Sequence, residues 1–164
     1  MVFSHPIRVY WEDTDAGGIV FYANYLKFME RARTEWLRAL GIEQQRLREQ
    51  TGGLFVVSET RLKYHRPARL DDQLLVTAQL QESGSASLII EQRVLLADMA
   101  GSQDEAAPSA AAARALLCEG SIRIGWVNAT TLRPARLPAH VLQSLAPCAP
   151  DTRHPIRGLS TVKP

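Results

Sequence analysis

Three acidic side chains near the start of the chain stand directly ahead of a pair of glycines. Glu12, Asp13 and Asp15 precede Gly17 and Gly18. A carboxylate can attack a carbonyl carbon or activate a water, and glycine lets a backbone approach a substrate closely. If a helix begins just beyond the glycines, its first N–H groups and partial positive charge suit the oxygen of a polarised carbonyl. The segment could therefore carry out acyl chemistry. Asp-Thr-Asp before Gly-Gly is also the ordinary composition of a tight turn, and on spacing alone we favour the turn.

Other kinds of reaction centre have no support in the sequence. The chain lacks the phosphate-binding motifs GxGxxG and GxxxxGK[ST], the metal-binding motifs HExxH and CxxC, and the serine-hydrolase motif GxSxG. Its histidines are scattered, at His5, His65, His140 and His154. We therefore expect no metal site and no bound cofactor.

The helix that would present its positive end to a substrate is the clearest element of the sequence. Between residues 24 and 40, apolar side chains recur at spacings of three and four, which predicts one amphipathic stripe. Asn24 is placed to cap its N-terminus and Gly41 to end it. Short helices are also predicted over residues 43–50 and 138–145.

The remaining elements show the period of two that is typical of strands. The first, residues 6–12, turns Val9 and Trp11 to one side, and in residues 54–65 the even-numbered side chains share one face. One polar face on each strand favours antiparallel pairing, and a sheet wrapped around the long helix predicts an α+β domain. The other predicted strands cover residues 73–81, 87–97 and 115–127.

Composition places the chain among soluble globular proteins. Of its 164 residues, 46% are hydrophobic and 22% charged, which suits one domain with a single core. The net charge of +2 gives no argument for nucleic acid, and no apolar run approaches the ~20 residues that span a bilayer. The start of the chain has no apolar h-region, so we expect no secretory signal. Cys118 and Cys148 show no pairing or metal-like spacing, and we therefore expect a cytoplasmic protein. We place the domain at residues 1–140, with a flexible loop insertion at 100–113. The C-terminal tail, 141–164, is expected to be partly disordered.

The first part of the chain resembles a known signature. The run V-Y-W-E-D-T-D-A-G-G-I-V-F-Y-A-N-Y-L-K-F-M-E-R-A-R-T-E-W-L-R resembles that of the 4-hydroxybenzoyl-CoA thioesterase family of hotdog-fold proteins, and within it the bacterial Tol-Pal-associated acyl-CoA thioesterase group. The likeness continues at Y-H-R-P-A-R-L-D-D and covers about residues 6–98 and 115–140. It implies a hotdog fold, in which one long central helix is wrapped by a five-stranded antiparallel sheet, and it implies acyl-CoA thioester hydrolysis.

The resemblance also implies roles for particular residues. The family's catalytic carboxylate falls on Asp15, as nucleophile or general base, and the backbone N–H that polarises the thioester carbonyl falls on Tyr22. Gly17, Gly18 and Asn24 are the accompanying candidates for substrate contact. The close bacterial group commonly has histidine where this chain has Tyr22. A backbone donor survives that difference, whereas an acid-base relay through an imidazole would not.

The expected partners follow from the same resemblance. The substrate is an acyl-CoA, with coenzyme A as part of the substrate. The turn Ser83–Ser87 lacks the basic cluster that grips the phosphates of CoA in some members. Arg66 and Arg69 could supply that charge, although by default they belong to a solvated strand end and loop. Family members pair their sheets edge to edge with the active site between protomers, so we expect a homodimer or homotetramer.

Other functions remain open from the sequence. One alternative is a non-catalytic module that binds acyl thioesters or acyl carrier protein, associated with the Tol-Pal envelope system at the inner membrane. A hotdog dehydratase is disfavoured, because that chemistry needs a histidine paired with an acid and Tyr22 occupies the place of the histidine. A purely structural oligomer is the plainest alternative. The sequence does not identify the acyl group.

Overall fold

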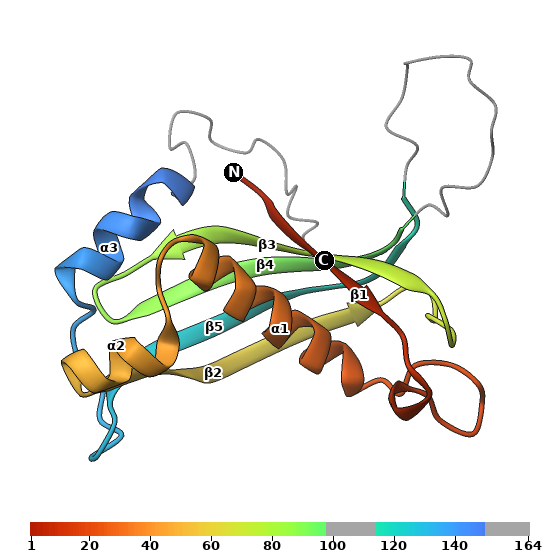
Figure 1. Cartoon of the computed structure of the whole chain (residues 1–164), viewed down its shortest axis with the longest axis horizontal. Helices are drawn as coiled ribbons and strands as arrows, with labels where there is room; N and C mark the ends of the chain where they lie inside the picture. The colour runs from red at the N-terminus through yellow and green to blue at the C-terminus, as the bar shows by residue number, and fades with distance from the viewer. Residues whose placement is uncertain (98–113, 150–164) are drawn as a thin grey trace, which may run out of the picture.

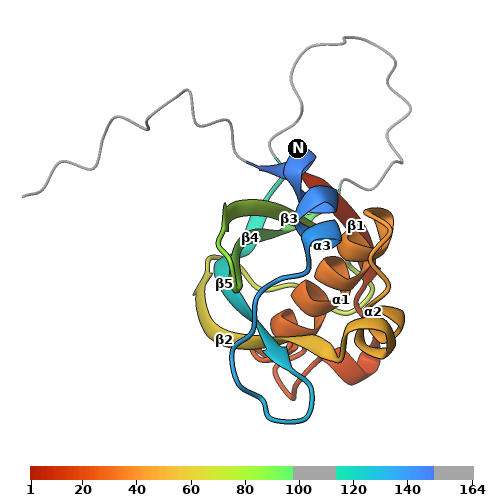
Figure 2. The same cartoon turned by 90° about the vertical axis from the view of Figure 1, so that its left-hand side faces the viewer.

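A five-stranded antiparallel sheet curves around one long helix (Figures 1 and 2). The computed structural model of the chain describes residues 1–97 and 114–149. The sheet order is β1-β3-β4-β5-β2, which leaves β2 and β1 as its two edges. The α+β architecture with a central helix is therefore confirmed. The strands are β1 (Phe3–Arg8), β2 (Gly53–Tyr64), β3 (Gln73–Ser83), β4 (Ser87–Leu96) and β5 (Leu116–Asn128); the helices are α1 (Asn24–Ala39), α2 (Gln44–Thr51) and α3 (Ala139–Leu145), with short 3-10 helices η1 (Trp11–Asp13) and η2 (Ala146–Cys148).

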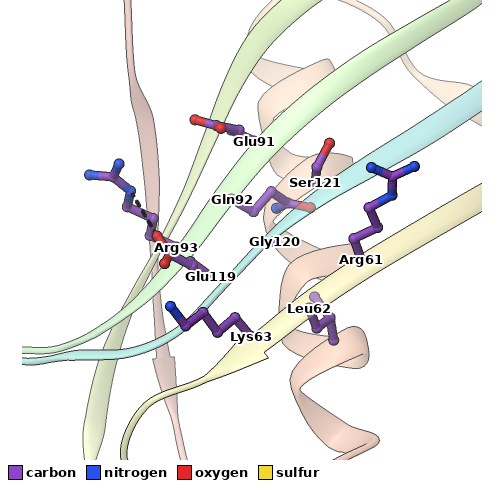
Figure 3. Close-up of a pocket in the computed structure, with 9 residues that line it drawn as sticks. All are labelled: Arg61, Leu62, Lys63, Glu91, Gln92, Arg93, Glu119, Gly120 and Ser121. Atoms are coloured by element: carbon purple, nitrogen blue, oxygen red, sulfur yellow. Dashed lines mark ion pairs between the residues drawn. The ribbon is translucent and has the colours of Figure 1, made fainter. Parts of the chain in front are cut away.

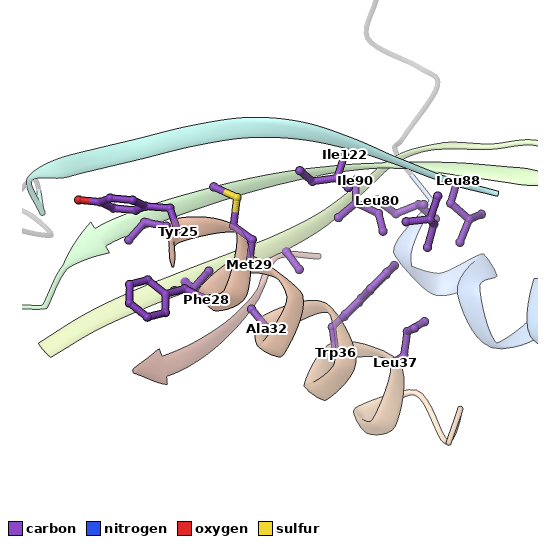
Figure 4. Packing of buried hydrophobic residues seen from close by; sticks show 14 of the residues in the cluster. Tyr25, Phe28, Met29, Ala32, Trp36, Leu37, Leu80, Leu88, Ile90 and Ile122 are labelled. Atoms are coloured by element: carbon purple, nitrogen blue, oxygen red, sulfur yellow. The ribbon is translucent and has the colours of Figure 1, made fainter. Parts of the chain in front are cut away.

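The apolar stripe of α1 forms the centre of the core. Figure 4 shows its side chains pointing toward the strands, where they meet Leu80, Ile90 and Ile122. Each large apolar side chain that is fully buried contributes roughly 1.5–3 kcal/mol relative to exposure, so this contact holds the helix on the sheet. The buried members of the stripe are Tyr25, Phe28, Met29, Ala32, Trp36 and Leu37.

Both ends of the segment before α1 differ from the sequence prediction. The predicted cap Asn24 is wrong, because Ala23 is the N-cap and the side chain of Asn24 turns back to the Asp13 carbonyl. The predicted inward position of Trp11 is also wrong, since this side chain is 80% exposed. The carboxylate of Asp13 accepts the N–H of Tyr10 at 2.8 Å, which closes a 3-10 turn one step after Val9. Turn chemistry therefore ends the alternating pattern earlier than expected.

A bulge divides β2 into two parts. In one part the odd-numbered side chains face α1, and in the other the even-numbered side chains do. The register shifts between Val57 and Glu59, so Val57 and Thr60 both pair with buried residues of β5, Ile124 and Ile122. Directly paired residues share a face of the sheet, so Val57 and Thr60 both face α1. The prediction that the even-numbered side chains of 54–65 share one face is wrong, because the extra residue inverts the alternation.

The end of the described chain adds to the core. The predicted helix at 138–145 is confirmed as α3, which buries Val141 and Leu145. The N–H of Leu137 donates to the Ser85 carbonyl between β3 and β4 at 2.8 Å, which ties this segment to the sheet (Figure 2). The expected loop insertion at 100–113 and the residues after 149 lie outside the described residues. No helix in the part of the chain that is described is long and apolar enough to span a membrane.

Candidate active site

The glycine pair folds the backbone into a turn around the carboxylate of Asp15. The N–H of Gly17 donates to Asp15 Oδ1 at 2.8 Å, and the N–H of Gly18 donates to the Asp15 carbonyl at 3.0 Å. Gly18 has φ +70°, which favours glycine, and a Cβ at Gly17 would lie 3.1 Å from Asp15 Oδ1. The turn interpretation of the sequence is therefore confirmed. It does not exclude chemistry, because the Asp15 side chain is exposed and its second oxygen has no protein donor among the described residues.

Hydrogen bonds fix the two ends of this turn. Asp15 N–H donates to the Ile19 carbonyl at 2.9 Å, and Val20 N–H donates to the Ala68 carbonyl at 2.9 Å. The Asp13 carbonyl accepts two donors, the N–H of Phe21 and the side-chain amide of Asn24, each at 2.9 Å. Asp15 is thus carried on a short loop whose ends are tied to the start of α1 and to the segment after β2.

The N-terminus of α1 offers free backbone donors. The N–H groups of Tyr22 and Ala23 have no acceptor among residues 1–97 and 114–149. The carbonyl of Tyr22 accepts the hydroxyl of Tyr64 at 3.0 Å, and the hydroxyl of Tyr25 accepts the N–H of Ala68 at 2.9 Å. Both tyrosines therefore brace this terminus. Unpaired N–H groups at the positive end of a helix are suited to stabilise a developing oxyanion.

A pocket of about 240 Å³ opens beside this terminus. It is lined largely by aromatic rings, and Tyr22 and Tyr64 meet edge to face with ring centres 6.5 Å apart. Partial burial raises the pKa of the Tyr64 hydroxyl, which donates to the Tyr22 carbonyl. The lining residues are Ile19, Val20, Tyr22, Tyr25, Tyr64, His65, Arg66 and Pro67.

The predicted site residues gather in one region but not in one cavity. Tyr22 and Arg66 line the pocket, whereas Asp15, Gly17 and Gly18 lie on the neighbouring loop, in which Ile19 pairs with Arg69. Asn24 is buried beneath that loop, with its amide N–H bonded to Asp13. The contact of Asn24 with substrate stays a prediction.

Several residues of this region were not predicted from the sequence. In the sequence, Tyr25 belongs to the apolar stripe of a helix and Tyr64 to one face of a strand. Their spacing does not show that the two rings are in contact, whereas in the structure the ring centres lie 5.5 Å apart. His65 lines the pocket and its Nε2 lies 2.9 Å from Glu119 Oε1. One feature of the sequence indicates that these tyrosines lie close together. Tyr25 follows segment 13–24 and Tyr64 begins segment 64–72, and both segments belong to the family resemblance.

The face of the sheet that points away from α1 carries polar side chains, several of which form ion pairs. A hollow of about 250 Å³ lies over Gly120, where the strands carry alternating charges (Figure 3). Arg61 pairs with Glu59 at 2.7 Å, and Glu119 lies 4.0 Å from Arg93. Exposed pairs of this kind contribute little to stability, so we assign this face to solvation. Within the described residues, no group of three His, Cys, Asp or Glu side chains is placed to hold a metal ion.

Comparison with known proteins identifies relatives over most of the chain. A family model described as the thioesterase superfamily matches residues 17–101. The acyl-CoA thioesterase YbgC of Haemophilus influenzae is 37% identical over 139 residues, which cover 85% of this chain and 90% of that protein. The acyl-CoA thioesterase YbgC of Helicobacter pylori is 33% identical over 131 residues, 80% of this chain and 90% of the relative.

Solved structures show the same fold. A probable thioesterase from Bartonella henselae superposes with a TM-score of 0.70 at 28% identity, covering 84% of this chain and all of that one (100%). The 1,4-dihydroxy-2-naphthoyl-CoA thioesterase Slr0204 from Synechocystis gives a TM-score of 0.74 at 18% identity, covering 94% of this chain and 100% of the other. The hotdog arrangement expected from the sequence is thereby confirmed.

Proposed function

This chain belongs to the thioesterase superfamily and is an acyl-CoA thioesterase, and from that premise we propose that Asp15 is its catalytic carboxylate and that the backbone N–H of Tyr22 polarises the thioester carbonyl. The observation that carries this proposal is a glycine turn that leaves one Asp15 oxygen open, on a loop tied to the unpaired N-terminus of α1.

The chemistry follows from these two groups. The carboxylate of Asp15 either attacks the acyl carbon or removes a proton from the water that does so. Negative charge then develops on the carbonyl oxygen, where N–H groups at the start of α1 stabilise it. The carbon–sulfur bond then breaks and the CoA thiolate takes up a proton. If water attacked, this step gives the free acid directly. If Asp15 attacked, the acyl group stays on Asp15 as an anhydride, which a water hydrolyses to release the free acid and restore the carboxylate.

Arginine side chains near the site are suited to the phosphates of CoA. Arg66 lies at the pocket and Arg69 pairs through its backbone with Ile19, and both side chains are exposed. No carboxylate of the described residues lies within ion-pair distance of either guanidinium. Guanidinium groups bind phosphate oxygens in a bidentate manner, so we assign the two residues to the CoA end of the substrate.

The complete site is proposed to form in a homodimer, or in a homotetramer of two such dimers. β2 is a 12-residue edge strand, and its residues Val57 and Tyr64, together with Leu26 of α1, leave apolar surface exposed. Exposed edges and apolar patches of this kind favour pairing with another chain. We place the enzyme in the cytoplasm.

A thiol-release assay on a panel of acyl-CoAs tests the function. Wild-type protein is expected to release free CoA, and Asp15→Asn should lower kcat by about 10²–10⁴-fold, the range for loss of a general base. Glu12→Gln is the matched control, because Glu12 is an exposed carboxylate on the same segment and its loss should leave kcat unchanged. Absent turnover in the wild type, or equal activity in the Asp15 variant, would overturn the proposal. Acyl-CoA binding without turnover would instead support the non-catalytic module.

A further inference from the structure

A second cavity runs along α1 on the side that faces β2. This groove has a volume of about 510 Å³. Leu26 and Arg33 of α1 form one wall, Val57 and Thr60 of β2 form the other, and Ile122 lies at its base. The pocket at the helix N-terminus is lined by Tyr25 of α1 and Tyr64 of β2. The groove is lined by Leu26 and Thr60 of the same two elements, so it lies next along α1 from the proposed reaction centre.

Arg33 places a positive charge inside this largely apolar groove. Its side chain is buried, with 9% of its surface exposed, and its Nη1 donates to Gln92 Oε1 at 2.7 Å. Gln92 is neutral and is held in turn by the Met29 carbonyl at 2.9 Å. Among the described residues, no carboxylate forms an ion pair with Arg33. Burial lowers the pKa of this guanidinium, and the nearby carboxylate of Glu30 offsets part of that shift.

The remaining donors of Arg33 are open to the groove. A guanidinium carries several N–H groups, and Gln92 uses only one nitrogen. No buried side-chain nitrogen or oxygen in the described chain lacks a partner, so the unused N–H groups are those that reach the cavity. Lys27 and Arg31 add positive charge to the rim, against one acid, Glu30, whose Oε1 accepts the Thr34 hydroxyl at 2.7 Å.

We propose that this groove receives the acyl chain and that Arg33 binds a carboxylate at the far end of that chain. The preferred substrates are then ω-carboxyacyl-CoAs, the CoA monothioesters of dicarboxylic acids. A carboxylate matches the geometry of a guanidinium and adds negative charge to a groove lined by three cations, Lys27, Arg31 and Arg33, and by one acid, Glu30. From Asn24, where α1 begins, to Arg33 the helix advances about 14 Å, which sets the length of chain required. This inference rests on the proposed thioesterase function.

Matched substrates test the proposal in the wild-type protein. Plain and ω-carboxylated acyl-CoAs of equal length are compared over a range of lengths. We expect kcat/KM to favour the carboxylated member by about tenfold or more at the length that reaches Arg33, since an unpaired buried charge is costly. Absence of a preference at every length would overturn the proposal.

Substitution of Arg33 assigns the preference to this residue. Arg33→Met should bring the ratio of kcat/KM between the carboxylated and plain acyl-CoAs down to about one, and Arg33→Lys should keep part of the preference. Arg38→Met is the matched control, because Arg38 is exposed on the same helix but does not line the groove, so its loss should change the preference little. Equal losses on both substrate classes in Arg33→Met and Arg33→Lys, with a change in oligomer mass, would show that Arg33 instead pairs with a second copy of the chain.

Binding of thioether analogues separates this inference from the catalytic proposal. These analogues cannot be hydrolysed, so calorimetry measures recognition alone. The ω-carboxyalkyl thioether of CoA should bind about tenfold more tightly than the alkyl one, to wild type and to Asp15→Asn alike. Discrimination in binding without thioester cleavage would remove only the catalytic proposal. Cleavage of both substrate classes with equal binding would remove only the role of Arg33.

Discussion

Two aspartates that lie two positions apart in the sequence have different environments. Asp13 is 2% exposed and its carboxylate accepts the N–H of Tyr10, so its charge is used within the protein. Asp15 is exposed, and within the described residues its carboxylate accepts only the N–H of Gly17, which leaves an oxygen for reaction. The sequence expectation that Asp13 is a turn residue is confirmed by its capping contact. Burial and hydrogen bonding, which residue type does not reveal, separate the two.

The proposed oxyanion donor can be tested without changing the charge of the site. Tyr22→Pro removes the backbone N–H, which has no acceptor among the described residues and so is not needed for folding. We expect kcat to fall by about 10²–10³-fold relative to Tyr22→Ala, as for loss of one oxyanion donor.

Tyr22→Ala is the control for loss of the ring, since it keeps the N–H. Circular dichroism and thermal unfolding of both variants would check that α1 is intact. Equal kcat in the two variants would exclude the Tyr22 N–H as the donor.

At the scale of elements, hydrophobic period predicted most of the architecture. The stripe of α1 and the alternation in β3, β4 and β5 could be predicted, because the apolar side chains of each element pack into one shared core along its whole length. The bulge after Val57 was not, because an extra residue in a strand needs no glycine or proline to mark it.

The candidate site could be predicted only in part, because some of its residues come together through contacts between distant segments of the chain. The Asp15 loop and the start of α1 are continuous in sequence, so one motif described both. Arg33 was not predicted, since charged residues are by default solvated and only the packing of Gln92 against α1 shows that this one is buried. Side chains that meet across the fold, such as Tyr22 and Tyr64, also require the structure.

The close contact of β2 and β5 depends on a glycine. A Cβ at Gly120 would lie 2.5 Å from the Arg61 carbonyl oxygen, which belongs to the neighbouring backbone and cannot rotate away. Gly120→Ala should therefore lower the free energy of unfolding by about 1–3 kcal/mol.

Urea unfolding measures this change, with Gly125→Ala as the control on the same strand. At Gly125 the nearest atom, the Ala86 carbonyl oxygen, would lie 3.9 Å from an added Cβ. A similar loss of stability in both variants would mean that strand propensity, rather than contact with β2, explains the effect.

At the scale of the whole molecule, the sheet order places the reaction region near an open edge. β1 and β2 are both edges, but only β2 lies beside the groove and the N-terminal pocket of α1. Pairing of two β2 edges would cover the groove and exclude water from it. Activity is therefore expected to depend on assembly.

Two valines with nearly equal exposure allow a direct test of which edge pairs. Val57 on β2 is 54% exposed and Val2 beside β1 is 55% exposed. We expect wild-type protein to have at least twice the chain mass by light scattering at micromolar concentration. Val57→Asp should shift it toward the monomer and lower kcat/KM, because a charge at a paired edge opposes association. Val2→Asp should change neither. A monomeric wild type, or equal effects of the two substitutions, would contradict assembly through β2, and a groove that stays open to water would then have to bind its substrate within one chain.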